Sequence, residues 1–424
     1  MITLQQPTLK IVTEPVSCLV KRQVEQMTEL WWSTPTTRPD ADPVYPSNQQ
    51  RENEKQLSRL LDGLQYGLKH APASESGRRE LRQTILSESF GVLKRIFGFE
   101  ERHLDVIRHN RLIEMVEQFS EQARGYDPTL SAEDIYQASR NVSSMNLMQL
   151  LLDLPVEITP AVFAYSMLYP YTDNYLDNPA ISIETKMGFS QRFWNRLAGK
   201  PGAAATPQEE RIWNLVEMVE KQYARPLYPQ VYESLLAIHD AQFRSLRQLR
   251  LGAAPYEVDV LRISFEKGGT SVLADGYLVA GHLSEEQAAF MFRYGCFTQL
   301  MDDLEDVDPD REAGSMTIFS QTAGHFALDA LTNRIFHLGK RVFELEGTFP
   351  VTDAAPLQEM VLRAIPFLLS LSAANLARFY TKDYLEMLEQ HMPIRFGFVR
   401  DQRKKLERNK ISLIRVIGAA GELH

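Results

Sequence analysis

The sequence predicts an all-α protein whose helices pack around one large core. Apolar residues recur with helical periodicity along almost the whole chain, while sustained alternation bounded by Asn-Gly or Asp-Gly turns is scarce. The sequence contains neither a repeat at solenoid periods nor a low-complexity tail. A chain of 424 residues is long enough to bury a large helical core.

The first part of the chain predicts a helical extension over residues 1–77. Residues 17–31 have the pattern of a first helix, and residues 48–69 fit a second one. A loop rich in proline and threonine, residues 33–47, separates them.

Residues 78–424 predict the main domain, a succession of long helices with short breaks between them. In one break Thr206 is placed to cap the next helix, with Glu209 and Glu210 in its first turn. The breaks, marked by proline, glycine and aspartate, fall near residues 125–134, 153–160 and 198–210.

Composition and charge narrow the classes of function. The formal net charge is −9, so the bulk charge favours neither a nucleic acid nor an anionic bilayer as the main partner. The two cysteines, Cys18 and Cys296, cannot form a disulfide framework or a zinc cluster. The N-terminus lacks signal-peptide features and no apolar stretch reaches the roughly 20 residues of a membrane span, so we expect a cytoplasmic protein.

A first acidic cluster closes a predicted helix that starts after Pro160. Asp173 and Asp177 are four residues apart, which places both carboxylates on one helix face. Tyr165 and Tyr169 lie on the preceding turns, and Pro170 is expected to kink the helix.

A second acidic cluster lies in GCFTQLMDDLEDVDPD, where aspartates again recur at intervals of four. Small and polar residues on the turns before it suggest room for a ligand, and Pro309 is expected to end the helix. The acidic residues are Asp302, Asp306 and Asp310, with Asp303 and Glu305 beside them, and the residues of the preceding turns are Gly295, Thr298 and Gln299.

Carboxylates paired in this way suit Mg²⁺, which takes one or two carboxylates and otherwise keeps waters and phosphate oxygens. Two such faces across a cavity could hold several ions bridged by a diphosphate, whose developing charge the metal would neutralise. The alternative for either cluster alone is a solvated acidic helix face.

A third feature is a lysine beside two glycines, Lys267 followed by Gly268 and Gly269. Two adjacent glycines cost a helix interior roughly 2 kcal/mol against alanine, so we expect a break there. Such a break would expose backbone N–H groups near Thr270 and Ser271 and form an anion cradle with Lys267 as its point charge. The alternative is a simple helix–helix turn.

Taken in order, these motifs resemble the class I isoprenoid synthases. EKGGTSVL is similar to the Lys-Thr segment of trans-prenyltransferases, and GCFTQLMDDLEDVDPD is similar to their second aspartate-rich motif. DNYLD departs from that family, because Asn174 stands where a second aspartate is usual. The two D-x-x-x-D clusters resemble the acidic motifs of squalene/phytoene synthases and large bacterial terpene synthases more closely than those of trans-prenyltransferases.

The resemblance implies a single antiparallel helical bundle around a central cavity, with more than one Mg²⁺ ion. It implies that Lys267, Thr270, Gln299 and Arg311 bind the diphosphate and that Tyr165, Tyr169 and Phe297 line the cavity around an allylic cation. The implied metal ligands are Asp173, Asp177, Asp302, Asp303 and Asp306.

The function implied is therefore that of a Mg²⁺-dependent terpene synthase acting on a linear prenyl diphosphate. A condensing enzyme, either chain-elongating or head-to-head, is the alternative, and a non-catalytic protein of the same fold is a third. The basic run 400–408 predicts a solvated helix end, with a lid or weak membrane-surface contact as alternatives. A homodimer is an open alternative to a monomer.

Overall fold

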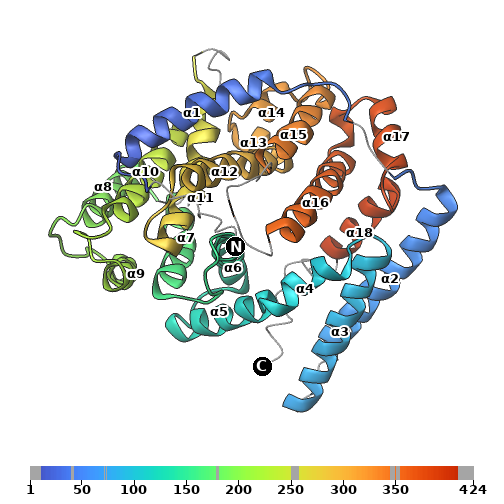
Figure 1. Cartoon of the computed structure of the whole chain (residues 1–424), viewed down its shortest axis with the longest axis horizontal. Coiled ribbons are helices and arrows are strands. Elements are labelled where there is room, and N and C mark those ends of the chain that lie inside the picture. Colours follow the sequence, from blue (N-terminus) through green and yellow to red (C-terminus); the bar gives the residue numbers. More distant parts are fainter. Residues whose placement is uncertain are drawn as a thin grey trace, which may run out of the picture.

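A computed structural model of the chain describes residues 11–39, 43–70, 72, 74–177, 181–249, 257–343, 349 and 354–408. Within these ranges every regular element is a helix, which confirms the all-α prediction (Figure 1). The first ten α-helices are α1 (Val16–Ser33), α2 (Ser47–Lys69), α3 (Glu75–Arg95), α4 (Glu101–His109), α5 (Leu112–Tyr126), α6 (Ala132–Leu151), α7 (Pro160–Asp177), α8 (Ile183–Leu197), α9 (Pro207–Gln222) and α10 (Pro229–Ser245). They are followed by η1 (Leu246–Leu249), α11 (Val260–Ala280), α12 (Glu285–Glu305), α13 (Val307–Ala313), α14 (Ile318–Thr322), α15 (Asp329–Val342), α16 (Ala354–Asn375), η2 (Ala377–Phe379), α17 (Lys382–Gln390) and α18 (Phe396–Arg408).

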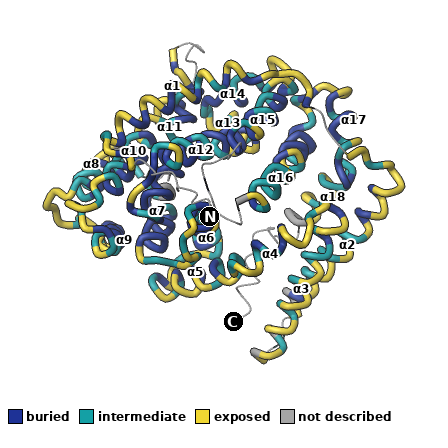
Figure 2. The backbone as a smooth tube through the Cα atoms, viewed as in Figure 1, coloured by how far each residue is buried: buried dark blue, intermediate teal, exposed yellow. Residues whose placement is uncertain are grey.

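The centre of the fold is the pair α11 and α12. A short connection joins them, and Ser284 caps α12 by accepting a hydrogen bond from the Gln287 backbone at 3.2 Å. α10 and α6 pack against α11, while α15 packs against α12. The burial colours of Figure 2 show that α11 and α12 are mostly enclosed, whereas α2 and α3 are largely exposed.

The glycine pair after Lys267 does not break the helix, so that prediction was wrong. α11 continues without interruption from Val260 to Ala280. A Cβ atom added at Gly268 would overlap the Gly295 carbonyl oxygen, and one at Gly269 would come within 2.5 Å of the Phe292 ring. The glycines therefore let α11 and α12 approach closely, and this packing outweighs their low helix propensity. For the same reason the small size of Gly295 serves packing and does not make room for a ligand.

The segment predicted as an extension contributes two helices that pack against distant parts of the chain. α1 lies across α10, α11, α12 and α15, and its Trp31 is 1% exposed (Figure 1). The Arg334 guanidinium of α15 lies over the rings of Trp31 and Trp32, at 5.1 and 5.2 Å from their centroids. α2 packs against α3 and is tied to the loop before α18 by Asn53, which donates to the Pro393 carbonyl at 2.9 Å.

Three further predictions concern a helix cap and two prolines. The Thr206 cap is confirmed, because its hydroxyl accepts from the Glu209 backbone at 3.2 Å. The helix after Pro160 is also confirmed, with Pro170 in its interior. Pro309 does not end α12, which stops at Glu305; Pro309 lies in the first turn of α13, where a missing N–H costs little.

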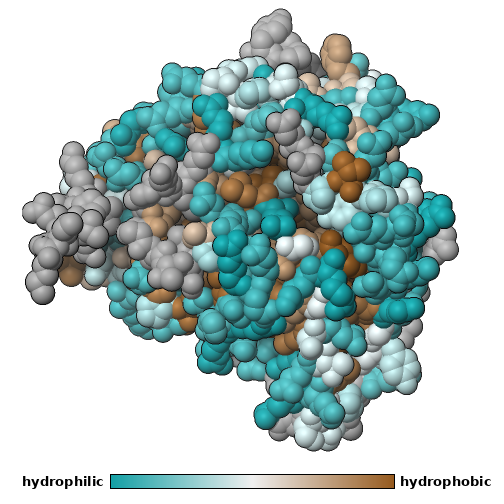
Figure 3. Space-filling view, turned by 45° about the vertical axis from the view of Figure 1, so that its right-hand side comes forward, coloured by the Kyte–Doolittle hydropathy of each residue, from teal (hydrophilic) through white to brown (hydrophobic). Residues whose placement is uncertain are grey.

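One described helix, α16, is long and apolar enough to pass a test for a membrane span, over Ala355–Asn375. Only 39% of its apolar window is buried inside the fold. Core helices of soluble proteins pass the same test, which uses length and composition alone. In Figure 3 hydrophobic residues appear as separate patches between hydrophilic ones on the face in view.

Candidate functional site

A cavity of about 70 Å³ lies where α7, α10, α11 and α12 meet. Four residues predicted for the site line it together, although they are distant in sequence: Tyr169, Lys267, Gln299 and Asp302. The remaining lining residues are Ile238, Gln242, Gly268, Ser271, Val272 and Thr298.

In the second acidic cluster, burial disfavours the ionised form of the carboxyl groups and so raises their pKa values. Although half of the Asp302 side chain is exposed, the protein atoms crowded around it raise its pKa by desolvation. Desolvation likewise raises the pKa of Asp306. Burial, followed by the charge of Asp306, raises the pKa of Asp310 to about 6. A nearby cation would therefore stabilise the ionised form of this cluster.

Two cations act on these carboxylates. Lys267, half-buried on α11, lowers the pKa values of Asp302 and Asp306 by charge, in opposition to burial. Arg140 of α6 has the same effect and forms an ion pair with Asp302, with 3.6 Å between Nη2 and Oδ1. Arg140 belongs to no motif and lies on a different helix, so no local pattern in the sequence points to it.

Asp303 occupies a different position from its neighbour Asp302. Its side chain is buried, and its two oxygens accept hydrogen bonds from Ser264 at 2.7 Å and from Gln299 at 2.8 Å. Burial raises its pKa to about 7 despite these bonds. Asp303 is thus a support for Gln299 beneath the cavity, and the structure does not place it with the carboxylates predicted to bind metal.

Several other predicted residues are also placed away from the cavity. Thr270 is fully buried, and its hydroxyl donates to the Glu266 carbonyl of its own helix at 2.7 Å. Arg311 donates to the Ala323 carbonyl, and its guanidinium lies 5.4 Å from the centroid of the Phe379 ring. Phe297 packs against Phe343 with ring centroids 6.0 Å apart, and Tyr165 is buried in the main core.

The first acidic cluster lies at the end of α7. The backbone of Asp173 follows the cavity-lining Tyr169 by one helical turn, and Asp177 is the last residue of the helix. The side chains of Asp173 and Asp177 fall outside the described residues. Their predicted metal contacts remain predictions.

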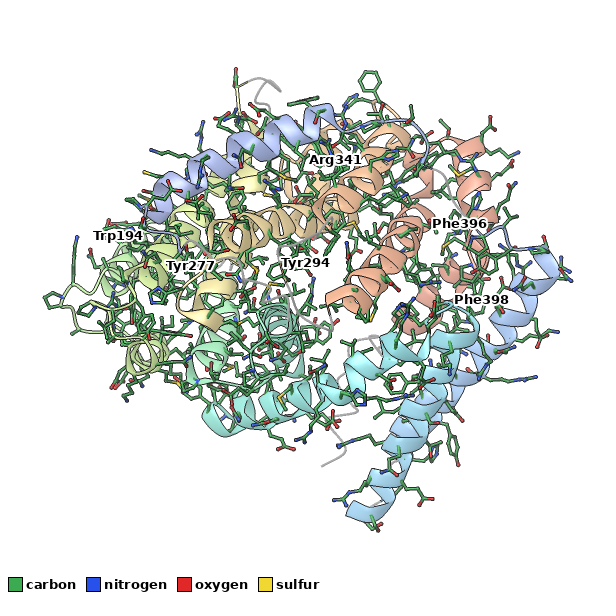
Figure 4. The ribbon with its side chains drawn as sticks, viewed as in Figure 1. Trp194, Tyr277, Tyr294, Arg341, Phe396 and Phe398 are labelled. Atoms are coloured by element: carbon green, nitrogen blue, oxygen red, sulfur yellow. The ribbon has the colours of Figure 1, made fainter. Side chains whose placement is uncertain are left out.

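A buried carboxyl that the sequence did not indicate lies one turn beyond Ser271 on α11. Asp275 is 1% exposed, and its Oδ2 accepts from the Ser144 hydroxyl of α6 at 3.2 Å. Its Oδ1 is buried and finds no hydrogen-bond partner among the residues that the structure describes. Burial raises the pKa of Asp275 to about 8, and the carboxyl acts by charge on Tyr294 of α12, which Figure 4 labels near the middle of the molecule.

The donor set suits Mg²⁺ in part. Among the described residues, no group of three or more His, Cys, Asp or Glu side chains is arranged to hold a metal ion. Mg²⁺, however, needs only one or two protein carboxylates when a phosphate supplies further oxygens. Asp302 and Asp306 are the candidates for such a pair, and burial raises the pKa of both carboxyls against the opposing charges of Arg140 and Lys267.

Comparisons with models of protein families, with curated proteins and with solved structures found no match.

Proposed function

We propose that the chain is a class I terpene synthase that uses Mg²⁺ to ionise a linear prenyl diphosphate and then cyclises or rearranges the cation. The observation that carries this proposal is the shared cavity of Lys267, Gln299 and Asp302, with Tyr169 entering it from α7. Lys267 comes from one motif of the resemblance, Gln299 and Asp302 come from a second, and Tyr169 lies one helical turn before the first acidic cluster. Their meeting at one cavity is unexpected if each motif were a solvated surface.

Each residue has a distinct role in the proposed reaction. Asp302 and Asp306 would hold Mg²⁺, which when bound neutralises charge that develops on the departing diphosphate. Lys267 provides a fixed positive charge for the diphosphate, and Gln299, held by Asp303, provides an oriented amide. The Tyr169 ring offers an aromatic face to the allylic cation.

The cavity is too small to hold a whole prenyl diphosphate. Its volume of about 70 Å³ is well below the roughly 300 Å³ at which ligand pockets for drug-sized molecules begin. We therefore assign the diphosphate to this cavity. The prenyl chain would need space beyond this cavity.

The test is incubation of the purified protein and Mg²⁺ with linear prenyl diphosphates of increasing length, each with and without isopentenyl diphosphate. A terpene synthase gives hydrocarbon or alcohol products in both series, detected by mass spectrometry. The condensing alternative gives longer diphosphates or a head-to-head product from two allylic diphosphates.

The variant Asp302→Ala should lower product formation by at least about a hundredfold, because a metal ligand is lost. Asp308→Asn is the matched control, since Asp308 pairs with Arg378 on the protein surface. Equal turnover by Asp302→Ala and the parent would contradict the metal assignment. Absence of turnover with every diphosphate would favour the non-catalytic alternative.

A further inference from the structure

The end of α10 and the short helix η1 present an exposed apolar surface. Phe243 and Leu246 are each 48% exposed, and Leu249 is 54% exposed. Arg244 and Arg247 alternate with them and are also exposed. We refer to residues 243–249 as the basic apolar tip.

The charge of this region is opposite to that of the chain as a whole. Residues 241–256 contain three arginines, Arg244, Arg247 and Arg250, and no aspartate or glutamate, whereas the chain carries −9. Arg244 is paired with Glu266 at 2.6 Å. A groove beside the tip, formed with α1 and α11, is lined by four basic residues, Lys21, Arg244, Arg247 and Arg262, and by three acidic ones, Glu25, Asp259 and Glu266. Arg262 pairs with Glu25 and Asp259 as Arg244 pairs with Glu266, so Arg247 and Lys21 supply the excess positive charge beside the tip.

The tip adjoins the candidate site. Gln242, the residue before Phe243, lines the cavity with Lys267. Glu266, the partner of Arg244, directly precedes Lys267 on α11. The tip and the cavity are therefore connected through residues adjacent in sequence at both α10 and α11.

We propose that the basic apolar tip binds the surface of an anionic lipid bilayer. Phenylalanine and leucine side chains bind favourably at the boundary between headgroups and acyl chains, because their apolar surface leaves water there. Arginines are attracted to anionic headgroups. A tip with both kinds of side chain on adjacent turns matches this two-part surface. The excess of basic over acidic side chains beside the exposed apolar ones favours an anionic lipid surface over an uncharged apolar patch for a protein partner.

Binding to a bilayer stands independently of the proposed reaction. The benefit of membrane binding rests on the proposed function. An apolar prenyl substrate or product would partition into the membrane, and a tip bound to the bilayer would place the cavity beside it.

The test is co-sedimentation of the full chain with vesicles of phosphatidylcholine, with and without phosphatidylserine. We expect binding to the anionic vesicles that falls in high salt. Arg247→Gln should weaken it by about fivefold, and Leu246→Ser combined with Leu249→Ser by about tenfold or more. Leu227→Ser is the matched control, because Leu227 is 68% exposed and precedes the other end of α10.

The outcomes separate the two proposals. Loss of vesicle binding in the Leu246/Leu249 variant, with the Leu227 variant unchanged, supports the tip. No binding by the parent overturns the inference, and so does equal binding by the Leu246/Leu249 variant, which would direct attention to another surface such as α16 or the basic run 400–408. Turnover of soluble prenyl diphosphates in the absence of vesicles reports on the proposed function alone.

Discussion

Arg140 and Asp302 show how a single contact between distant helices changes the chemistry expected of a motif. From the sequence, the second acidic cluster contains only anions and a distant lysine. In the structure, the guanidinium of Arg140 is 3.6 Å from Asp302 and also lowers the pKa of Asp306. Arg140 therefore stabilises the ionised carboxylates by its positive charge, as a bound metal cation would.

Arg140→Gln is predicted to strengthen the binding of Mg²⁺ alone. The arginine and the metal compete for Asp302, and an ion pair of which half is exposed contributes less than about 1 kcal/mol, so we expect a gain of up to about fivefold. The measurement is calorimetric titration with Mg²⁺ in the absence of substrate. Arg22→Gln, which removes an exposed pair with Glu14, is the control. Weaker Mg²⁺ binding by Arg140→Gln would mean that the arginine orients Asp302 for the metal.

Asp275 is a second residue whose properties arise from its surroundings. A carboxyl that is 1% exposed is costly to ionise, and this burial raises its pKa to about 8. In the folded protein the group stays protonated up to that pH, while in the unfolded chain it ionises near pH 4. Its contribution to stability therefore falls as pH rises from about 4 to about 8.

Asp275→Asn is predicted to stabilise the protein relative to the parent by an amount that grows across this pH range. Asparagine keeps the shape and cannot ionise, so the linked penalty disappears. Denaturant unfolding at pH 5 and pH 8 measures the difference between the two proteins. A difference that stays constant with pH would contradict the raised pKa. Ser144→Ala provides a comparison that removes the hydrogen bond without removing the carboxyl.

At the scale of elements, the contact between α11 and α12 determines the site. Gly268 and Gly295 face each other so closely that neither has room for a Cβ atom. This approach places Lys267 and Gln299 at the same cavity. Helix propensity alone predicts a break at these glycines, because propensity does not include the helix that packs against them.

Gly268→Ala is predicted to destabilise the protein by about 1–3 kcal/mol, since the added methyl group forces the two helices apart. The free energy of unfolding in urea measures this. Gly63→Ala, in the exposed helix α2 with open space around its Cβ position, should instead stabilise by about 0.5–1 kcal/mol. If both substitutions had the same sign, close packing would not be the reason for the glycine at 268.

At the scale of the whole molecule, α1 belongs to the main core. Its inner face contains Leu19, Met27 and Trp31, each no more than 1% exposed, in one cluster with residues from α11, α12 and α15. A helix from the beginning of the chain thus covers the pair that positions the cavity.

Trp31→Ala is predicted to lower the free energy of unfolding by about 3–5 kcal/mol, because it leaves a large hole under α1. The adjacent Trp32, 65% exposed, is the control, and its replacement by alanine should cost less than about 1 kcal/mol. Thermal unfolding followed by circular dichroism measures both. Similar small effects would show that α1 is dispensable for the core.

The sequence by itself determined the helices and the positions of the acidic residues along them. Apolar periodicity and caps such as Thr206 are local properties, so residues 17–31, 48–69 and the helix after Pro160 could be predicted to within a few residues. The sequence also places Asp306 four residues after Asp302, and in the structure Asp306 caps α12 one turn after Asp302.

Only the tertiary structure decided which side chains meet. Arg140 reaches Asp302 from another helix, Asp303 lies against Ser264, Asp275 is enclosed by α6, and the glycines serve a contact between α11 and α12. These facts depend on residues far apart in the chain, whose proximity no local pattern encodes. Such neighbours determine how far each side chain is desolvated and which ion pairs it forms. The pKa values and contacts in the candidate site therefore depend on tertiary packing and not on the sequence motifs alone.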